Sequence, residues 1–196
     1  IRGQSEKPKL AFKALGKRFA IFMGIVALFD LGNSSDAFLA LRAQERGVSV
    51  LGIMVMLALF NLVYTLASTP AGDLSDRVGR RRLIIAGWLL YALVYLGFGL
   101  ARESWHIGVL YALYGLYYGL AYGTAKAMIA DLVPEVLRGT AYGTYNAILG
   151  LIDLPASLIA GLLWQGAGGW QGFGPSAPFL FGAGMALLAA LMLLLW

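Results

Sequence analysis

Long apolar runs recur along this chain, and each has the length needed to cross a lipid bilayer. A membrane-spanning helix needs about 20 apolar residues, whereas a barrel strand needs only about 9–11. Because lipid offers backbone polar groups no hydrogen-bond partner, runs of this length must form helices. The pattern predicts an all-α membrane protein with six transmembrane helices, at residues 19–41, 48–68, 83–101, 107–133, 141–164 and 179–196.

The composition agrees with this pattern and excludes several kinds of site. Of the 196 residues, 60% are hydrophobic and 13% are charged, whereas globular domains are about 25% charged. The absence of cysteine excludes disulfides, cysteine-based metal centres and a cysteine nucleophile, and the single histidine, His106, excludes a multi-histidine site. We therefore expect neither a metal nor a cofactor.

The basic residues predict how the helices are oriented, because loops on the cytoplasmic side are enriched in Lys and Arg. Only Arg42, Arg46 and Arg102 fall on the opposite side of the predicted topology. Both ends of this segment, including a basic leader at residues 1–18, are then expected in the cytoplasm of a cell-membrane protein. The formal net charge of +5 follows from this topology and requires no nucleic-acid partner. Twelve of the 15 basic residues lie on the cytoplasmic side: six in the leader, and Arg77, Arg80, Arg81, Arg82, Lys126 and Arg138.

The connection between the second and third apolar runs has an unusual order of charges and glycines. A basic loop of this kind could simply anchor the topology. The order here, however, closely resembles the loop signature of the major facilitator superfamily, Gly-x-Leu-x-Asp-Arg-x-Gly-Arg-Arg. The matching positions are Gly72, Asp76, Arg77, Gly79, Arg80 and Arg81.

This resemblance implies a specific architecture and a gating role for the loop. Transporters of this family contain twelve helices in two six-helix halves, so this chain resembles one half and lacks the other. The basic leader favours the C-terminal half, whereas the well-kept loop signature is more usual in the first half. The resemblance also implies that Arg80 pairs with Asp131 and that Asp76 lies near a helix N-terminus of the missing half.

Polar side chains inside the predicted helices mark a candidate transport pathway, since a charge in the bilayer centre costs at least about 2.5–3.5 kcal/mol. If residues 19–41 form one helix, Asp30, Asn33 and Asp36 share a face. Asp36 is then either solvated or paired with Arg42. The alternative is that these groups only hydrogen-bond neighbouring helices.

The fifth run, residues 141–164, repeats this arrangement. Asn146, Asp153 and Ser157 fall on one narrow helical face, and Pro155 predicts a local disturbance of the helix. Such a face suits either a cavity wall or hydrogen bonding between helices.

The fourth run, residues 107–133, combines aromatic and small residues. Tyr114 and Tyr118 belong to a stripe of tyrosines that could contact an amphipathic or cationic substrate, or simply pack. The adjacent glycines Gly115, Gly119 and Gly123 predict close helix packing.

These features together predict a secondary transporter of a small solute that works by alternating access with proton or ion coupling. Asp30 and Asp153, with Asp36, are the candidate coupling residues. The candidate substrate contacts are Asn33, Asn146, Ser157, Tyr114 and Tyr118. An enzyme is disfavoured because no catalytic cluster can be assembled, and no nucleotide-binding loop occurs. A channel or a structural membrane protein remains the alternative. The expected partners are the missing half, the bilayer and the substrate.

Overall fold

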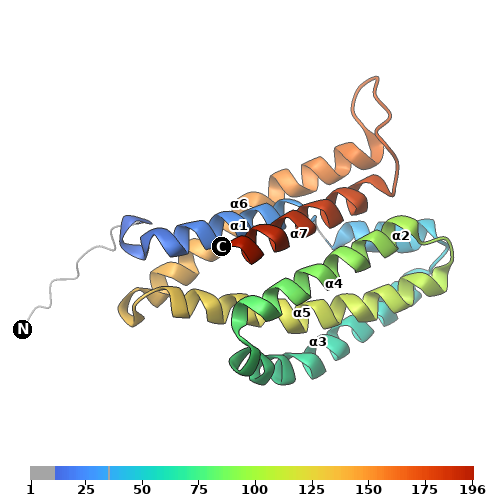
Figure 1. The fold of residues 1–196 in the computed structure, drawn as a ribbon. Coiled ribbons are helices and arrows are strands. Elements are labelled where there is room, and N and C mark those ends of the chain that lie inside the picture. Colours follow the sequence, from blue (N-terminus) through green and yellow to red (C-terminus); the bar gives the residue numbers. More distant parts are fainter. Residues whose placement is uncertain (1–11, 35) are drawn as a thin grey trace, which may run out of the picture.

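The computed structural model describes residues 12–34 and 36–196, and it confirms an all-α fold (Figure 1). Short 3-10 helices precede two of the long helices, at Phe12–Leu15 and Glu135–Leu137. The α-helices are α1 (Gly16–Leu31), α2 (Ala37–Glu45), α3 (Val50–Val78), α4 (Arg80–Leu100), α5 (Ser104–Leu132), α6 (Arg138–Gln165) and α7 (Ala177–Leu195).

The long helices form a bundle in which neighbours in space are not always neighbours in sequence. Helix α5 packs along both α3 and α4, α4 packs against α7, and α1 lies against α6 and α7. Figure 1 shows α1, α6 and α7 together on one side and α3, α4 and α5 on the other. Residues from α1, α4, α5 and α6 can therefore face a common interior.

Length and apolar composition identify four helices of the described chain that could cross a membrane. They are Val50–Val78, Arg80–Leu100, Glu135–Gln165 and Ala177–Leu195. Helix α5, with 29 residues that include five tyrosines, and α1, with 16 residues, are not among these four. Four of the six predicted spans thus have the expected character.

The prediction of one continuous helix over residues 19–41 is wrong. Helix α1 ends at Leu31 and α2 begins at Ala37. Glycine and short polar residues favour other conformations over a helix, and tertiary contacts fix the break. A Cβ atom on Gly32 would lie 2.5 Å from the Met185 Cβ, and the Gly32 carbonyl accepts a hydrogen bond from the Tyr91 hydroxyl at 3.2 Å.

The connection expected between the second and third runs is also shorter than predicted. Helix α3 continues through Pro70 to Val78, so Gly72, Asp76 and Arg77 belong to its final turns. Helix α4 begins immediately afterwards, at Arg80. The turn consists of Gly79 alone, whose φ of +95° is a conformation that favours glycine.

The predicted glycine packing on α5 is confirmed at two of three positions. A Cβ atom on Gly115 would lie 2.5 Å from the Phe60 carbonyl oxygen, and one on Gly119 would lie 2.6 Å from the Ala67 Cβ. Gly123 has no such neighbour within 4 Å. Helices α3 and α5 therefore approach each other at backbone distance, as small residues allow in membrane proteins.

Candidate functional site

Two adjoining cavities, each of about 330 Å³, lie between α5 and α6. The first is also lined by α1 and α4, and the second by the segment between α1 and α2. We call the first the aromatic lobe; its lining includes Phe29, Asp30, Trp88, Tyr117, Tyr122, Tyr145 and Asn146. We call the second the polar lobe; it is lined by Asn33, Ser34, Asp36, Tyr118, Asp153 and Ser157. Asn33, Tyr118 and Asp153 line both lobes.

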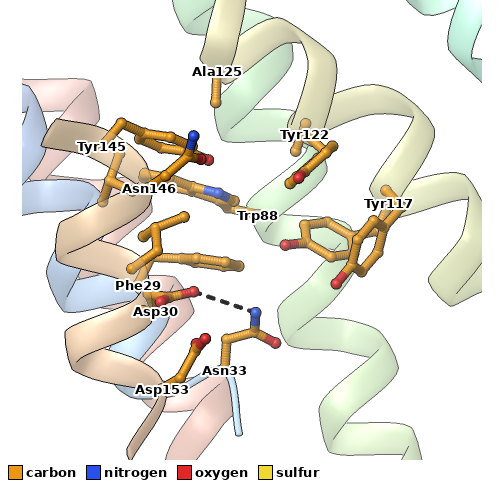
Figure 2. Close-up of a pocket in the computed structure, with 15 residues that line it drawn as sticks. Phe29, Asp30, Asn33, Trp88, Tyr117, Tyr122, Ala125, Tyr145, Asn146 and Asp153 are labelled. Atoms are coloured by element: carbon orange, nitrogen blue, oxygen red, sulfur yellow. Dashed lines mark hydrogen bonds between the residues drawn. The ribbon is translucent and has the colours of Figure 1, made fainter. Parts of the chain in front are cut away.

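Asp30 occupies the last turn of α1 and projects into the aromatic lobe, as Figure 2 shows. Only 7% of its surface is exposed. Its Oδ1 accepts a long hydrogen bond of 3.4 Å from the Asn33 amide, and its buried Oδ2 has no hydrogen-bond partner. A buried oxygen without a donor is energetically costly, so this carboxyl group has a vacant acceptor position.

Asp36 stands at the start of α2, where an Asp side chain usually caps the helix. It makes no such cap here. Its Oδ1 instead accepts a hydrogen bond of 2.9 Å from the Tyr114 hydroxyl. Tyr114 is therefore not a wall of either lobe but a buried residue that holds Asp36 in position.

The suggested pairing of Asp36 with Arg42 does not occur. The Arg42 side chain is buried, with a relative exposure of 1%, and Nη1 lies 2.5 Å from Glu45 Oε2. Its Nε and Nη2 donate hydrogen bonds of 2.9 Å to the carbonyls of Phe98 and Gly99. Arg42 thus joins α2 to the C-terminal end of α4. The sequence pattern did not predict these carbonyl partners, because they lie more than 50 positions away from Arg42.

The predicted polar face of α6 does line the cavities. Asn146 faces the aromatic lobe, Ser157 faces the polar lobe, and Asp153 contributes to both. The helix continues through Pro155 from Arg138 to Gln165, so the helical spacing used in the prediction applies along its whole length.

The predicted tyrosine stripe supplies Tyr118 to both lobes, but most of the aromatic wall was not predicted. Trp88 of α4 stacks on Phe29 with ring centroids 4.8 Å apart and an angle of 9° between the planes. Tyr117 and Tyr145 complete the wall. Tyr117 lies outside the predicted tyrosine stripe, and Trp88 belongs to a run with uniformly apolar character, so neither position stood out.

A second polar cluster surrounds the turn between α3 and α4, away from the two lobes. The predicted ion pair between Arg80 and Asp131 is present, and Arg80 also lies 3.1 Å from Asp76. Arg81 Nε donates a hydrogen bond of 2.7 Å to the Leu193 carbonyl near the end of α7. These contacts join α3, α4, α5 and α7 at one end of the bundle. Two other signature residues do not join helices in this way. Gly72 lines a small cavity with Asp76 and Arg80, and Arg77 is exposed.

Within residues 12–34 and 36–196, no group of three or more His, Asp or Glu side chains is arranged to hold a metal ion.

Comparison with known proteins identifies the family. The model of the major facilitator superfamily matches residues 20–196. This chain belongs to that superfamily. An uncharacterised transporter of the same type from Methanocaldococcus jannaschii is 38% identical over 192 residues, which cover 95% of this chain and 46% of the relative.

More distant relatives differ in what their names state. Multidrug resistance protein 2 of Bacillus subtilis is 29% identical over 190 residues, covering 95% of this chain and 43% of that protein. A Na(+), Li(+), K(+)/H(+) antiporter of Planococcus maritimus is 27% identical over 133 residues, covering 65% of this chain and 31% of that protein. The chain therefore spans less than half the length of these relatives.

Proposed function

We propose that this chain is one six-helix half of a secondary transporter that moves a small solute by alternating access. In this arrangement α1 and α2 form a single broken span, and α5 is the fourth span. The two lobes form this half's share of the transport pathway. The observation that carries the proposal is the convergence of Asp30, Asp36 and Asp153 on connected cavities inside a bundle of apolar helices.

Broken helices and intramembrane acids are features that transporters use at their binding sites. A carboxyl group that is protonated in one state and charged in another can couple solute movement to a proton gradient. Asp30 and Asp153 are placed for this role because both line the aromatic lobe. Asn33, Asn146, Ser157 and Tyr118 supply polar contacts for the solute.

The turn between α3 and α4 supplies the gating contacts in this proposal. Arg80 contacts both Asp76 and Asp131, so it links three helices at one end of the bundle. If Asp76 meets the other half in only one of the two access states, these contacts bias the equilibrium between the states.

The remaining parts of the proposal concern the whole protein. Its other half packs against this one within the bilayer of the cell membrane, and this segment is the C-terminal half. Both ends of the segment face the cytoplasm, including the leader at residues 1–18, of which residues 1–11 lie outside the described structure. The homologues favour a transporter over an enzyme, since one relative is named as a transporter and another as an antiporter.

The test uses full-length protein in liposomes that contain a trapped pH-sensitive dye. A gradient of Na⁺ or of ethidium is applied, and proton movement is recorded together with uptake of the probe. Coupled transport predicts saturable proton movement in wild type. Downhill probe flux that does not saturate and moves no protons would instead indicate a channel, and the absence of any probe flux would contradict the proposal.

Two variants test the coupling residues in the same assay. Asp30→Asn and Asp153→Asn are expected to abolish the proton movement and the dependence of uptake on pH. Asp73→Asn is the matched control, because Asp73 is an exposed acid of α3 that lines neither lobe. Proton movement retained in both cavity variants, at normal expression, would remove these acids from the mechanism.

A further inference from the structure

The charge inside the two lobes is strongly one-sided. Three carboxyl groups line them, from Asp30, Asp36 and Asp153. None of the described residues that line either lobe is Lys, Arg or His. Carboxylates in an apolar setting need a positive partner or a proton, because the charge is costly to bury without one. The lobes thus favour a cation and disfavour an anion.

Asp30 is the carboxyl group best placed to receive that cation. Its Oδ2 is buried without a hydrogen-bond partner, and its Oδ1 has only the 3.4 Å contact with Asn33. Asp36, by contrast, already accepts a hydrogen bond from Tyr114. Asp30, whose carboxyl group keeps this unused acceptor capacity, lines the aromatic lobe beside the ring of Phe29 (Figure 2).

The walls of this lobe suit an organic ion better than a bare metal ion. Phe29 and Trp88 present a stacked aromatic pair, and Tyr117, Tyr122 and Tyr145 add further rings. Ring faces attract cations and also bury apolar groups. A metal ion would leave most of the 330 Å³ aromatic lobe, and its rings, without a partner.

One ring of the lobe, that of Tyr122, already contacts the positive charge of a side chain of this protein. The Lys126 ammonium lies 4.2 Å from the centroid of the Tyr122 ring and donates a hydrogen bond of 3.0 Å to the Tyr122 hydroxyl. The internal ammonium group shows the type of contact that a cationic ligand would make. It also places a repelling positive charge at the edge of the lobe.

We propose that the aromatic lobe binds an organic cation with an apolar or aromatic body. The cationic centre lies at Asp30, and the body lies against Phe29, Trp88 and Tyr145. This inference names the substrate class of the site and rests on the proposed transport function. It goes beyond that function because it specifies the sign of the charge, the anchoring acid and the aromatic surface.

The experiment compares two ions of nearly the same shape and opposite charge, tetraphenylphosphonium and tetraphenylborate. Binding to full-length protein in nanodiscs is measured by equilibrium dialysis against protein-free nanodiscs, without any ion gradient. Wild type is expected to bind the phosphonium at least about tenfold more tightly than the borate. Equal binding, or tighter binding of the borate, would overturn the inference.

Two variants, one that removes a negative charge and one that removes a positive charge, make the test specific to the lobe. Asp30→Asn is expected to weaken phosphonium binding about tenfold, whereas Asp30→Glu keeps the charge and most of the binding. Lys126→Met removes the repelling charge and is expected to strengthen binding. Asp73→Asn is the control with no expected change. Unchanged binding in Asp30→Asn, or weaker binding in Lys126→Met, would contradict the assignment.

The result is separable from the test of the proposed function. Loss of the charge preference alongside intact proton-coupled flux of Na⁺ would overturn only the substrate class. Selective phosphonium binding in a protein that moves no protons with any probe would overturn only coupled transport. A thermal unfolding profile of Asp30→Asn equal to that of wild type shows that its loss of binding is not a loss of folding.

Discussion

Replacing Arg42 by Met should destabilise the protein more than replacing any nearby arginine. Met keeps much of the apolar stem but removes every donor of the guanidinium group. The change removes the donor of the Phe98 carbonyl and one of the two donors of the Gly99 carbonyl, which keeps its 2.6 Å hydrogen bond from the Ser176 hydroxyl. It also leaves Glu45 without its partner at 2.5 Å.

The size of the effect follows from this geometry. An unsatisfied buried acceptor costs about 1–3 kcal/mol, and removing one partner of a buried ion pair costs about 3–5 kcal/mol. These terms overlap, and Glu45 is 34% exposed, which reduces its share. The expected loss in the free energy of unfolding is therefore about 3 kcal/mol, towards the lower end of the buried-pair range.

The assay is unfolding of the full-length protein by SDS in mixed micelles, followed by circular dichroism. Arg46→Met is the matched control, because Arg46 contacts the same glutamate at 3.5 Å but is more exposed. Its expected loss is at most about 1 kcal/mol. Arg42→Lys should fall between the two, since one ammonium group cannot reproduce the planar set of donors. Equal losses for Arg42→Met and Arg46→Met would refute the reasoning.

Two further predictions concern helix packing and the turn between α3 and α4. Gly115→Leu should lower the resistance of the protein to unfolding by SDS, because its Cβ atom would lie 2.5 Å from the Phe60 carbonyl oxygen. Gly123→Leu is the control and should have no such effect, because Gly123 has open space around it. Equal effects of the two variants would contradict the packing argument. Asp131→Arg should break the contact with Arg80 and shift cysteine-labelling accessibility across the membrane. The exchange Arg80→Asp with Asp131→Arg should move labelling part of the way back towards wild type, because it restores this pair but loses the contact of Arg80 with Asp76. A double variant no closer to wild type than the single one would argue against the pair as a gating contact.

The sequence predicted the site best where the helix is regular. Asn146, Asp153 and Ser157 line the lobes as expected because α6 is continuous, so helical spacing determines which residues share a face. The contact between Arg80 and Asp131 followed from the resemblance to a known family. This contact could be predicted because the loop signature contains Arg80 and lies where α3 ends and α4 begins.

The α1–α2 region shows where spacing alone fails. Asp30, Asn33 and Asp36 were placed together for a wrong reason, since the helix that was meant to align them ends at Leu31. The close contact of Gly32 with α7 decides the break, and a local pattern does not contain that contact. The buried position of Arg42 is equally a property of the assembled bundle, because its acceptors come from the end of α4.

Helix α5 connects the two lobes with the polar cluster at the turn between α3 and α4. Tyr117 and Tyr118 touch the lobes, and Asp131 lies 13 positions beyond Tyr118, or about 20 Å along the helix axis. Gly115 and Gly119 hold α5 at backbone distance from α3. This close packing restricts sliding of α5 along α3 when its tyrosine side chains are displaced. A displacement of those rings would therefore move α3 and α5 together, and the far end of this helix pair is where Arg80 contacts Asp131.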